Sequence, residues 1–483
     1  MKYGVSKLIN PVMRTAIGAF LLSSAFAVTP ASAAKAEPVT DADRAMLRAI
    51  WEDAIRTPTA KGNGQVPKLA EMFAARLREA GFRDEDIQIL PLDIDGETTA
   101  GLVVRYAGRD PKAKPIALLG HMDVVDAVKE NWSTDPYVPT EKDGFIYGRG
   151  SSDNKAGISA VVAAFIRLKR AGFVPARDLV IAFSGDEETG MKTTRMLTQH
   201  PLVSRAEYAL NADAGGGSVD ENGKVSMSIQ SAEKTYADFA ISVTNPGGHS
   251  SAPMPSNAIY ELAHALTKLQ ALRFPVEFNE ITRIMVADLA EEKGGELGAA
   301  LKALLANPND AAARAVAEKY PRDANLLWTT CVATMLQGGN APNALPQNAT
   351  ATVNCRIMPG TRVADVQQQI AQAIGNDKVQ VTQVGDSRES PVSPVNAPLF
   401  ASLQKAVRVT YPGVVMKPSM SSGGTDGREF RSAGIPTYGA GNLVQKAGDG
   451  RAHGTDERVP LEPFFKQLEF WDALLRDVGG KAK

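Results

Sequence analysis

Histidine and acidic side chains recur directly after short apolar runs of this sequence. Residues 115–120 are followed by His121 and Asp123, and residues 178–183 are followed by the acidic triplet 186–188. A histidine two residues before an aspartate can place a metal ligand beside the carboxylate that orients it. A histidine that is simply hydrogen-bonded in the core is the alternative interpretation of His121.

The acidic triplet offers two kinds of carboxylate chemistry. Three consecutive acids after a buried strand are costly unless a positive charge neutralises them. Glu187 and Glu188 could divide the work, one binding metal and the other serving as a general base. A solvated acidic turn is the alternative.

A glycine-rich loop at residues 148–157 leads into a predicted helix and contains Asp153. The loop lacks the Gly-Lys-Ser/Thr ending of a P-loop and the glycine triplet of a dinucleotide-binding loop. Asp153 is therefore either a metal ligand or a cap on the helix N-terminus. Asp213 again follows an apolar run, and His453 lies in a polar segment far downstream.

The candidate metal ligands could meet in a single cleft. They are His121, Asp153, Glu188, Asp213 and His453. Two histidines and three carboxylates suit two zinc ions with one bridging carboxylate and a position left for water. The chain has 5 histidines, and the helical setting of His200 and His264 predicts structural or surface roles for those two.

Strands that alternate with helices must position these residues. Apolar runs at 115–120, 178–183 and 206–210 alternate with helical stretches such as 157–170. This pattern predicts an α/β fold with a mostly parallel sheet that is covered on both faces. Ligands bind beyond the carboxyl ends of the strands in such sheets, which is where the candidate residues lie.

From about Lys234 the pattern changes to the β-α-β-β-α-β order of a ferredoxin-like sandwich. Its predicted strands are 236–243, 326–336, 349–357 and 378–384, and its predicted helices are 257–272 and 363–374. A charged, alanine-rich helical insertion occupies about residues 291–320. We therefore expect a catalytic domain in two parts, residues 34–234 and 387–483, split around a lid and dimerisation domain at residues 235–386.

Composition restricts the class of protein. The 483 residues are 44% hydrophobic and 22% charged, which is enough material for a packed core. The balance of 53 basic and 54 acidic residues gives no electrostatic indication of nucleic-acid binding or of attraction to an anionic membrane.

The N-terminus has the three parts of a secretory signal peptide. Lys2, Lys7 and Arg14 precede an apolar run at residues 16–28, and Ala-Ser-Ala at 31–33 offers a cleavage site. We expect residues 1–33 to be removed, leaving a periplasmic or secreted protein with no stable membrane insertion. An uncleaved anchor or a buried first helix is the alternative.

The two cysteines, Cys331 and Cys355, exclude a disulfide-rich scaffold and a cysteine-rich zinc module. They lie on predicted adjacent strands and would face each other in a hairpin centred near Asn343. A disulfide is then the hypothesis for an oxidising compartment, and two small buried apolar residues are the alternative.

Taken together, the motifs resemble the di-zinc metallopeptidase family of carboxypeptidase S, glutamate carboxypeptidase, aminoacylase and succinyl-diaminopimelate desuccinylase. The matching segments are 120–125, 148–155, 186–188, 247–251, 343–346, Arg356 before Pro359-Gly360, 422–426 and 453–457. They occur in order between about residues 42 and 476, and the lid insertion looks closest to the carboxypeptidase S branch.

The resemblance implies a role for each metal ligand. His121 and Asp213 would hold one zinc ion, Glu188 and His453 the other, and Asp153 would bridge them. Another divalent ion such as Co²⁺ or Mn²⁺ would also suit these ligands.

The resemblance also implies catalytic roles. Asp123 would orient His121, and Glu187 would deprotonate the bridging water. His249 of the lid would stabilise the oxyanion, in this family often across a dimer, so a homodimer through the lid is one implied assembly. A helix-entry residue in a Gly-rich turn is the alternative for His249.

Contacts to the free carboxylate of the substrate would come from Asn343, Arg356, Gly424 and Thr425. The fork of an arginine guanidinium binds a carboxylate through two parallel hydrogen bonds. A surface arginine and a flexible Ser-Gly-Gly loop are the alternatives. The chain has Asn354 before Arg356 where the family pattern Asp-x-Arg is frequent, and Ala-Leu rather than Val-Ile at 344–345.

These observations lead to one functional hypothesis with two rivals. The chain is expected to be an exported zinc-dependent exopeptidase or amidohydrolase, of the metallo-carboxypeptidase or aminoacylase type. It would cleave the amide bond of C-terminally free peptides or N-acyl amino acids with Glu187 as the general base. The rivals are a non-catalytic periplasmic binding protein on the same scaffold and a structural zinc protein, which would close its coordination shell.

Overall fold

The computed structural model describes residues 37–446, 449 and 451–480. The expected signal peptide at residues 1–33 lies outside them. None of the helices in this described part of the chain combines the length and the apolar character that crossing a bilayer requires.

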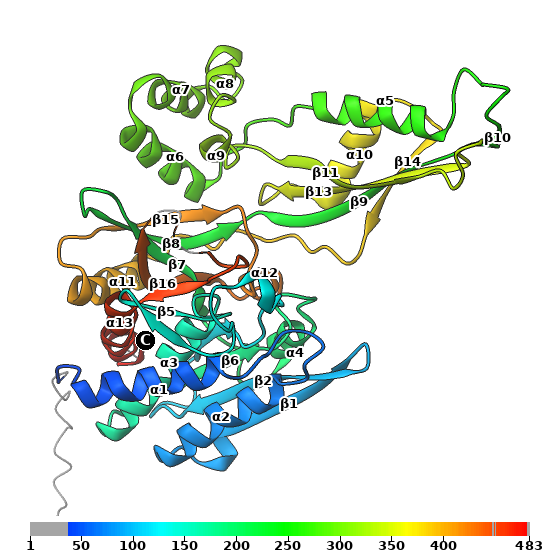
Figure 1. The fold of residues 1–483 in the computed structure, drawn as a ribbon. Coiled ribbons are helices and arrows are strands. Elements are labelled where there is room, and N and C mark those ends of the chain that lie inside the picture. Colours follow the sequence, from blue (N-terminus) through cyan, green and yellow to red (C-terminus); the bar gives the residue numbers. More distant parts are fainter. Residues whose placement is uncertain (1–36, 447–448, 450, 481–483) are drawn as a thin grey trace, which may run out of the picture. The chain divides into compact units, whose positions relative to one another are not determined.

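An eight-stranded mixed sheet forms the centre of the fold (Figure 1). Its order is β1-β2-β6-β3-β7-β8-β15, and β16 pairs with β7 beside this path. The strands are β1 (Ile87–Ile94), β2 (Glu97–Tyr106), β3 (Ile116–His121), β6 (Leu179–Ser184), β7 (Tyr208–Val219), β8 (Val225–Glu233), β15 (Met416–Ser421) and β16 (Thr437–Lys446). Four of the pairings are parallel, namely β3 with β6, β3 with β7, β8 with β15 and β7 with β16.

Helices cover both faces of this sheet. The larger core lies under α1 (Asp41–Ile55), α2 (Val66–Glu79), α3 (Lys155–Arg170), α11 (Ala397–Thr410) and α13 (Leu461–Gly479). The opposite face packs against α4 (Lys192–Gln199) and α12 (Gly427–Ser432). Because side chains alternate along a strand, Leu179 and Ile181 enter the first core while Val180 enters the second. Every residue of β3 and β6 is buried, as their continuous apolar runs indicate.

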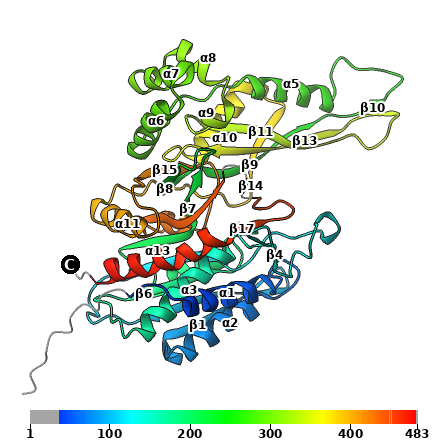
Figure 2. The same cartoon turned by 60° about the vertical axis from the view of Figure 1, so that its left-hand side comes forward.

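A separate four-stranded antiparallel sheet has the order β11-β13-β9-β14 (Figure 2). Its strands are β9 (Thr235–Thr244), β11 (Thr330–Gly338), β13 (Asn348–Ile357) and β14 (Val379–Val384), and α5 (Ala258–Ala271) and α10 (Val363–Ile374) cover one face. The element order is β-α-β-β-α-β. Cys331 and Cys355 are register partners on β11 and β13 and form a disulfide, which confirms the predicted pairing.

The helical insertion is longer than the sequence pattern indicated. It consists of α6 (Glu280–Lys293), α7 (Gly295–Ala306), α8 (Ala311–Ala317) and α9 (Pro321–Ala324), which share their own apolar cluster. Two small sheets complete the described strands: β10 (Gly248–His249) with β12 (Ala344–Leu345), and β4 (Thr140–Lys142) with β5 (Phe145–Tyr147) and β17 (Arg458–Pro460).

The mixed α/β fold with a mostly parallel central sheet is thus confirmed. The expected lid, residues 235–386, begins where β9 begins and ends just after β14. Its separation as a domain stays a prediction, because the described residues from Pro38 onward form one compact unit.

Candidate active site

Two neighbouring parallel strands bring the first candidate residues together. His121 ends β3, and its register partner is Ser184 at the end of β6. The acidic triplet follows Ser184 directly. Glu187 and Glu188 therefore reach the same sheet edge as His121.

His121 lies at the centre of the acidic groups and is buried. Its Nε2 is 2.9 Å from Oδ1 of Asp153 and 3.5 Å from Oδ1 of Asp213. Its Nδ1 lies 2.9 Å from the backbone carbonyl oxygen of Asp123 and 3.5 Å from the carboxylate of that residue. The imidazole thus has one nitrogen held by the backbone and the other directed at two carboxylates.

Asp153 lies between the two histidines. One carboxylate oxygen faces His121, and the other, Oδ2, lies 3.2 Å from Nε2 of His453. That same nitrogen is 3.0 Å from Oε1 of Glu188. The capping alternative for Asp153 is wrong, because Asn154 occupies the N-cap of α3 and makes no side-chain capping bond.

Three overlapping groups have ligand atoms within 4.8 Å of one another. They are His121, Asp153 and Asp213; His121, Glu187 and Glu188; and Asp153, Glu188 and His453. Imidazole nitrogens and carboxylate oxygens are the donors that zinc and similar divalent ions take. The residues present therefore fit two neighbouring cations that share Asp153.

The electrostatics of the cluster favour added positive charge. Burial raises the pKa of Asp213 to about 7, against the opposing charge of His121. Hydrogen bonds to Asp153 and Glu188 raise the pKa of His453 to about 10. Burial opposes ionisation of Asp153, yet hydrogen bonds from both histidines hold its pKa below the usual range. A site that draws protons onto its histidines in this way also attracts metal cations.

Carboxylates just outside the cluster hold its backbone in place. Oδ1 and Oδ2 of Asp123 accept hydrogen bonds from the backbone N–H groups of Glu187 and Glu188, at 3.1 and 3.0 Å. Asp186 is buried and accepts from the backbone N–H groups of Lys192 and Thr193 at the start of α4. The acidic triplet is therefore not a solvated turn.

Glu457 is a positioning residue that the sequence reasoning missed. Its fully buried carboxylate accepts hydrogen bonds from the backbone N–H groups of Gly150, Ser152 and Asp153 and from Nη1 of Arg149. The signal that could have found it is its place at the end of the segment that begins with His453.

The expected substrate-binding residues lie in two places. Arg356 of β13 donates from Nη1 to the carbonyl oxygen of Ser422 (3.4 Å), at the start of the loop that contains Gly424 and Thr425. The Thr425 hydroxyl is buried, accepts from Asn211 and donates to Glu233, both at 3.1 Å. This loop adjoins the acidic cluster, because Asn211 also accepts from the backbone N–H of Asp213.

His249 and Asn343 lie elsewhere. They are held together through β10 and β12, where the N–H of Ser250 donates to the carbonyl oxygen of Asn343 (3.0 Å). Figures 1 and 2 place β10 at the outer end of the lid strands, away from the central sheet. The structure therefore unites all five candidate metal ligands with Glu187 but leaves His249 and Asn343 outside that group.

The model of the peptidase family M20/M25/M40 matches residues 117–477 of the chain. The chain belongs to this family. Two relatives agree with the assignment. The mouse N-fatty-acyl-amino acid synthase/hydrolase PM20D1 is 30% identical over 375 residues, covering 75% of this chain and 74% of that protein. A probable carboxypeptidase S-like 2 from Dictyostelium discoideum is 29% identical, covering 78% of this chain and 74% of that protein.

Solved M20 structures share the fold at low identity. An M20 metallo-carboxypeptidase from Sulfolobus solfataricus aligns with a TM-score of 0.67 and 17% identity, over 89% of this chain and 98% of that one. A Bacillus subtilis protein described as a dinuclear metal binding peptidase aligns with a TM-score of 0.57 and 12% identity, over 91% and 99%. The family match and the two relatives show that this M20 protein is a hydrolase that acts on amide bonds.

Proposed function

We propose that this protein is an exported metal-dependent exopeptidase or N-acyl amino acid hydrolase whose substrates end in a free carboxylate. The observation that supports it best is the position of Asp153, whose two oxygens face two different histidines. That arrangement suits a carboxylate shared between two cations. One relative is named as a probable carboxypeptidase and the other as an N-fatty-acyl-amino acid synthase/hydrolase. Both names refer to an amide bond next to a free carboxylate.

His121 and Asp213 would hold one metal ion, and Glu188 and His453 the other, with Asp153 between them. Zinc suits this donor set, and Co²⁺ or Mn²⁺ would be accepted by the same atoms. Bound divalent cations supply two effects, a lowered pKa of water and polarisation of the substrate carbonyl.

Glu187 is the proposed general base. Its backbone N–H is held by Asp123, and its carboxylate lies within reach of the ligands His121 and Glu188. Burial raises the pKa of Glu187 well above its ordinary value, although the charge of His121 opposes the shift. A carboxylate with a raised pKa is well matched to accepting a proton from the attacking water and passing it to the leaving amine.

His249 is the proposed donor to the oxyanion. The backbone N–H of Ser251 donates to Nδ1 of His249 (3.1 Å), and the Ser251 hydroxyl lies 2.7 Å from the same atom. Nδ1 is thus an acceptor, so the ring proton lies on Nε2 and can be donated. Because His249 lies at the outer end of the lid, we propose that it serves the site of a second copy.

The lid offers a surface for that copy. β11 is an edge strand, and exposed apolar side chains cluster on it and on the adjoining part of the lid. They are Met254, Ile259, Tyr260, Val332, Met335 and Leu336. An exposed apolar edge strand is a ready pairing surface. Leu336→Lys should therefore shift the protein to monomers in sedimentation.

Arg356, Gly424 and Thr425 are the proposed contacts to the carboxylate of the substrate, and Asn343, which lies beside His249 at the outer end of the lid, would make its contact in the site of a second copy. Thr425 would act mainly by fixing its loop, since its hydroxyl is already engaged by protein groups. Export is supported by the N-terminal sequence pattern and by the Cys331–Cys355 disulfide, which suits a periplasmic or extracellular setting.

The proposal is tested by amine release from a panel of C-terminally free dipeptides and N-acyl amino acids, each with a matched C-terminal amide, with and without chelator. Chelator-sensitive hydrolysis that is much faster for each free acid than for its amide is the expected result. Fully metallated protein that hydrolyses no member of the panel would instead favour the binding-protein alternative.

A further inference from the structure

The lid sheet has one face that α5 and α10 leave uncovered. Along β9 and β13, side chains alternate between the buried face, with Ala237 and Cys355, and this open face. Tyr236 and Arg356 are register partners on the open face, and so are the neighbouring Asp238 and Asn354. The open face thus presents a two-by-two group of polar side chains.

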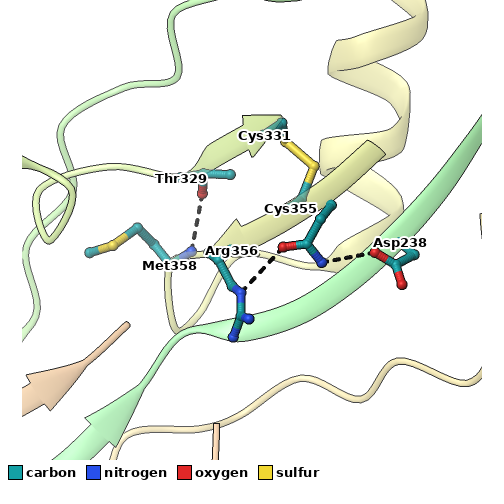
Figure 3. The surroundings of a disulfide bond; sticks show 7 residues. Asp238, Thr329, Cys331, Cys355, Arg356 and Met358 are labelled. Atoms are coloured by element: carbon teal, nitrogen blue, oxygen red, sulfur yellow. Dashed lines mark hydrogen bonds between the residues drawn. A yellow bond between two sulfur atoms is a disulfide. The ribbon is translucent and has the colours of Figure 1, made fainter. Parts of the chain in front are cut away.

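These four side chains form a closed ring of contacts. The guanidinium carbon of Arg356 lies 4.7 Å from the centre of the Tyr236 ring. Its Nε donates to Oδ1 of Asn354 (3.3 Å), whose Nδ2 donates to Oδ1 of Asp238 (2.8 Å). The Tyr236 hydroxyl donates to Oδ2 of Asp238 (2.7 Å), which closes the ring. Figure 3 shows Arg356 and Asp238 joined through the amide between them.

The ring leaves part of the guanidinium available. Nε is engaged by Asn354 and Nη1 by the carbonyl oxygen of Ser422, while Nη2 has no hydrogen-bond partner among the described residues. Within the described part of the chain, no carboxylate pairs directly with Arg356, since the charge of Asp238 is separated from it by the Asn354 amide. An incoming carboxylate can therefore take the terminal N–H groups without displacing an ion pair.

The ring also explains the departure from the Asp-x-Arg pattern. In this chain Asn354 occupies the position where aspartate is frequent. Asp238 on the neighbouring strand provides the missing carboxylate, which reaches Arg356 through the side chain of Asn354. Burial raises the pKa of Tyr236, and its hydrogen bond to Asp238 raises it further, so the hydroxyl keeps its proton for that bond at neutral pH.

We propose that Tyr236, Asp238 and Asn354 are positioning residues that orient Arg356 and thereby set the preference of the enzyme for substrates with a free carboxylate. Tyr236 fixes the plane of the guanidinium by stacking, and Asp238 fixes its rotation through Asn354. This inference rests on the proposed function, in which Arg356 recognises the carboxylate.

The test uses the free-acid substrate that is hydrolysed fastest in the panel, its C-terminal amide, and folded variants with unchanged thermal unfolding. For Asp238→Ala and for Tyr236→Leu, KM for the free acid should rise about tenfold while kcat stays within twofold. Hydrolysis of the amide should not change. Tyr320→Leu is the matched control, because Tyr320 is 37% exposed and Tyr236 is 38% exposed.

A rescue separates positioning from general stability. Asn354→Asp in the Asp238→Ala background places a carboxylate directly against Arg356 and restores the charge lost at residue 238, so KM should return to within threefold of wild type. Only this inference is overturned if Asp238→Ala and Tyr236→Leu leave KM unchanged, or slow the hydrolysis of the acid and of the amide equally. In that case Arg356→Ala still abolishes the preference for the free acid. If Arg356→Ala keeps the preference, the carboxylate contact in the proposed function fails as well.

Discussion

The carboxylate of Glu457 accepts a hydrogen bond from the backbone N–H of Asp153 (2.9 Å), although 304 positions separate the two residues in the chain. The same carboxylate holds Gly150 and Ser152, so one buried side chain shapes the whole loop that presents Asp153. The shared ligand of the proposed metal site therefore depends on the segment that also contains His453.

Glu457→Gln should weaken both the fold and the metal site. An amide offers one acceptor where the carboxylate offers two, so backbone donors and Arg149 would be left buried and unpaired. We expect a loss of about 3 kcal/mol in the free energy of unfolding and about 10- to 100-fold weaker metal binding.

Urea unfolding and competition with a metallochromic chelator measure these two effects. Glu462→Gln is the control, since that side chain is exposed on the neighbouring helix α13. A Glu457→Gln protein equal to this control in both measurements would contradict the role of Glu457.

Glu187→Gln should separate catalysis from metal binding. The amide keeps the size of the side chain but cannot accept a proton, so kcat should fall by about 10²- to 10⁴-fold. Metal content by mass spectrometry should match that of wild type. Normal turnover would refute the assignment as base, and loss of one metal ion would show that Glu187 is a ligand instead.

Lys234 should make stability depend on pH. It is fully buried, and Nζ donates to the carbonyl oxygens of Asn325 and Trp328. Burial lowers its pKa from 10.5 to about 7, helped by the charge of Arg356. Between these values the unfolded chain holds a proton that the folded chain has released, so the free energy of unfolding rises with pH.

The rise from pH 7 to pH 9 should be about 2 kcal/mol greater in wild type than in Lys234→Met, as urea unfolding at the two pH values would show. Lys61→Met, at a lysine that is 55% exposed, should keep the wild-type increment. Parallel pH profiles for wild type and Lys234→Met would disprove this account of Lys234.

The disulfide should be a measurable part of the stability. Cys331 and Cys355 are 24 positions apart, and closing a loop of that size stabilises a fold by about 3 kcal/mol. The double variant Cys331→Ser/Cys355→Ser should lose about this amount, and reductant should lower the stability of wild type alone. Two free thiols in unreduced wild-type protein, found by mass spectrometry, would contradict the pairing.

Local pattern was enough to predict the buried centre of the fold. Strands β3 and β6 are continuous apolar runs, and they lie fully buried between two helical layers. Strand β1 was missed because it is an edge strand, contains Pro91 and is only partly buried, so it lacks a clear signal.

Four of the five candidate ligands could be found from sequence because they follow an apolar run or lie in a glycine-rich loop, and His453 lies in the polar segment 453–457 that matches the family motif. The roles of Glu457, Tyr236 and Asp238 could not, because they act on backbone N–H groups or cross-strand partners. Such contacts depend on the register of segments that are distant in the chain. A side chain whose partner is set by the register of distant segments therefore has no recognisable spacing in the local sequence.

The most direct test of the two-metal hydrolase is to titrate metal-free protein with zinc while following hydrolysis of the best free-acid substrate. The account predicts no activity without metal, activity that saturates at two zinc ions per chain, and loss of that saturation in Asp153→Asn. Full activity of chelator-treated protein that contains no bound metal would contradict the account.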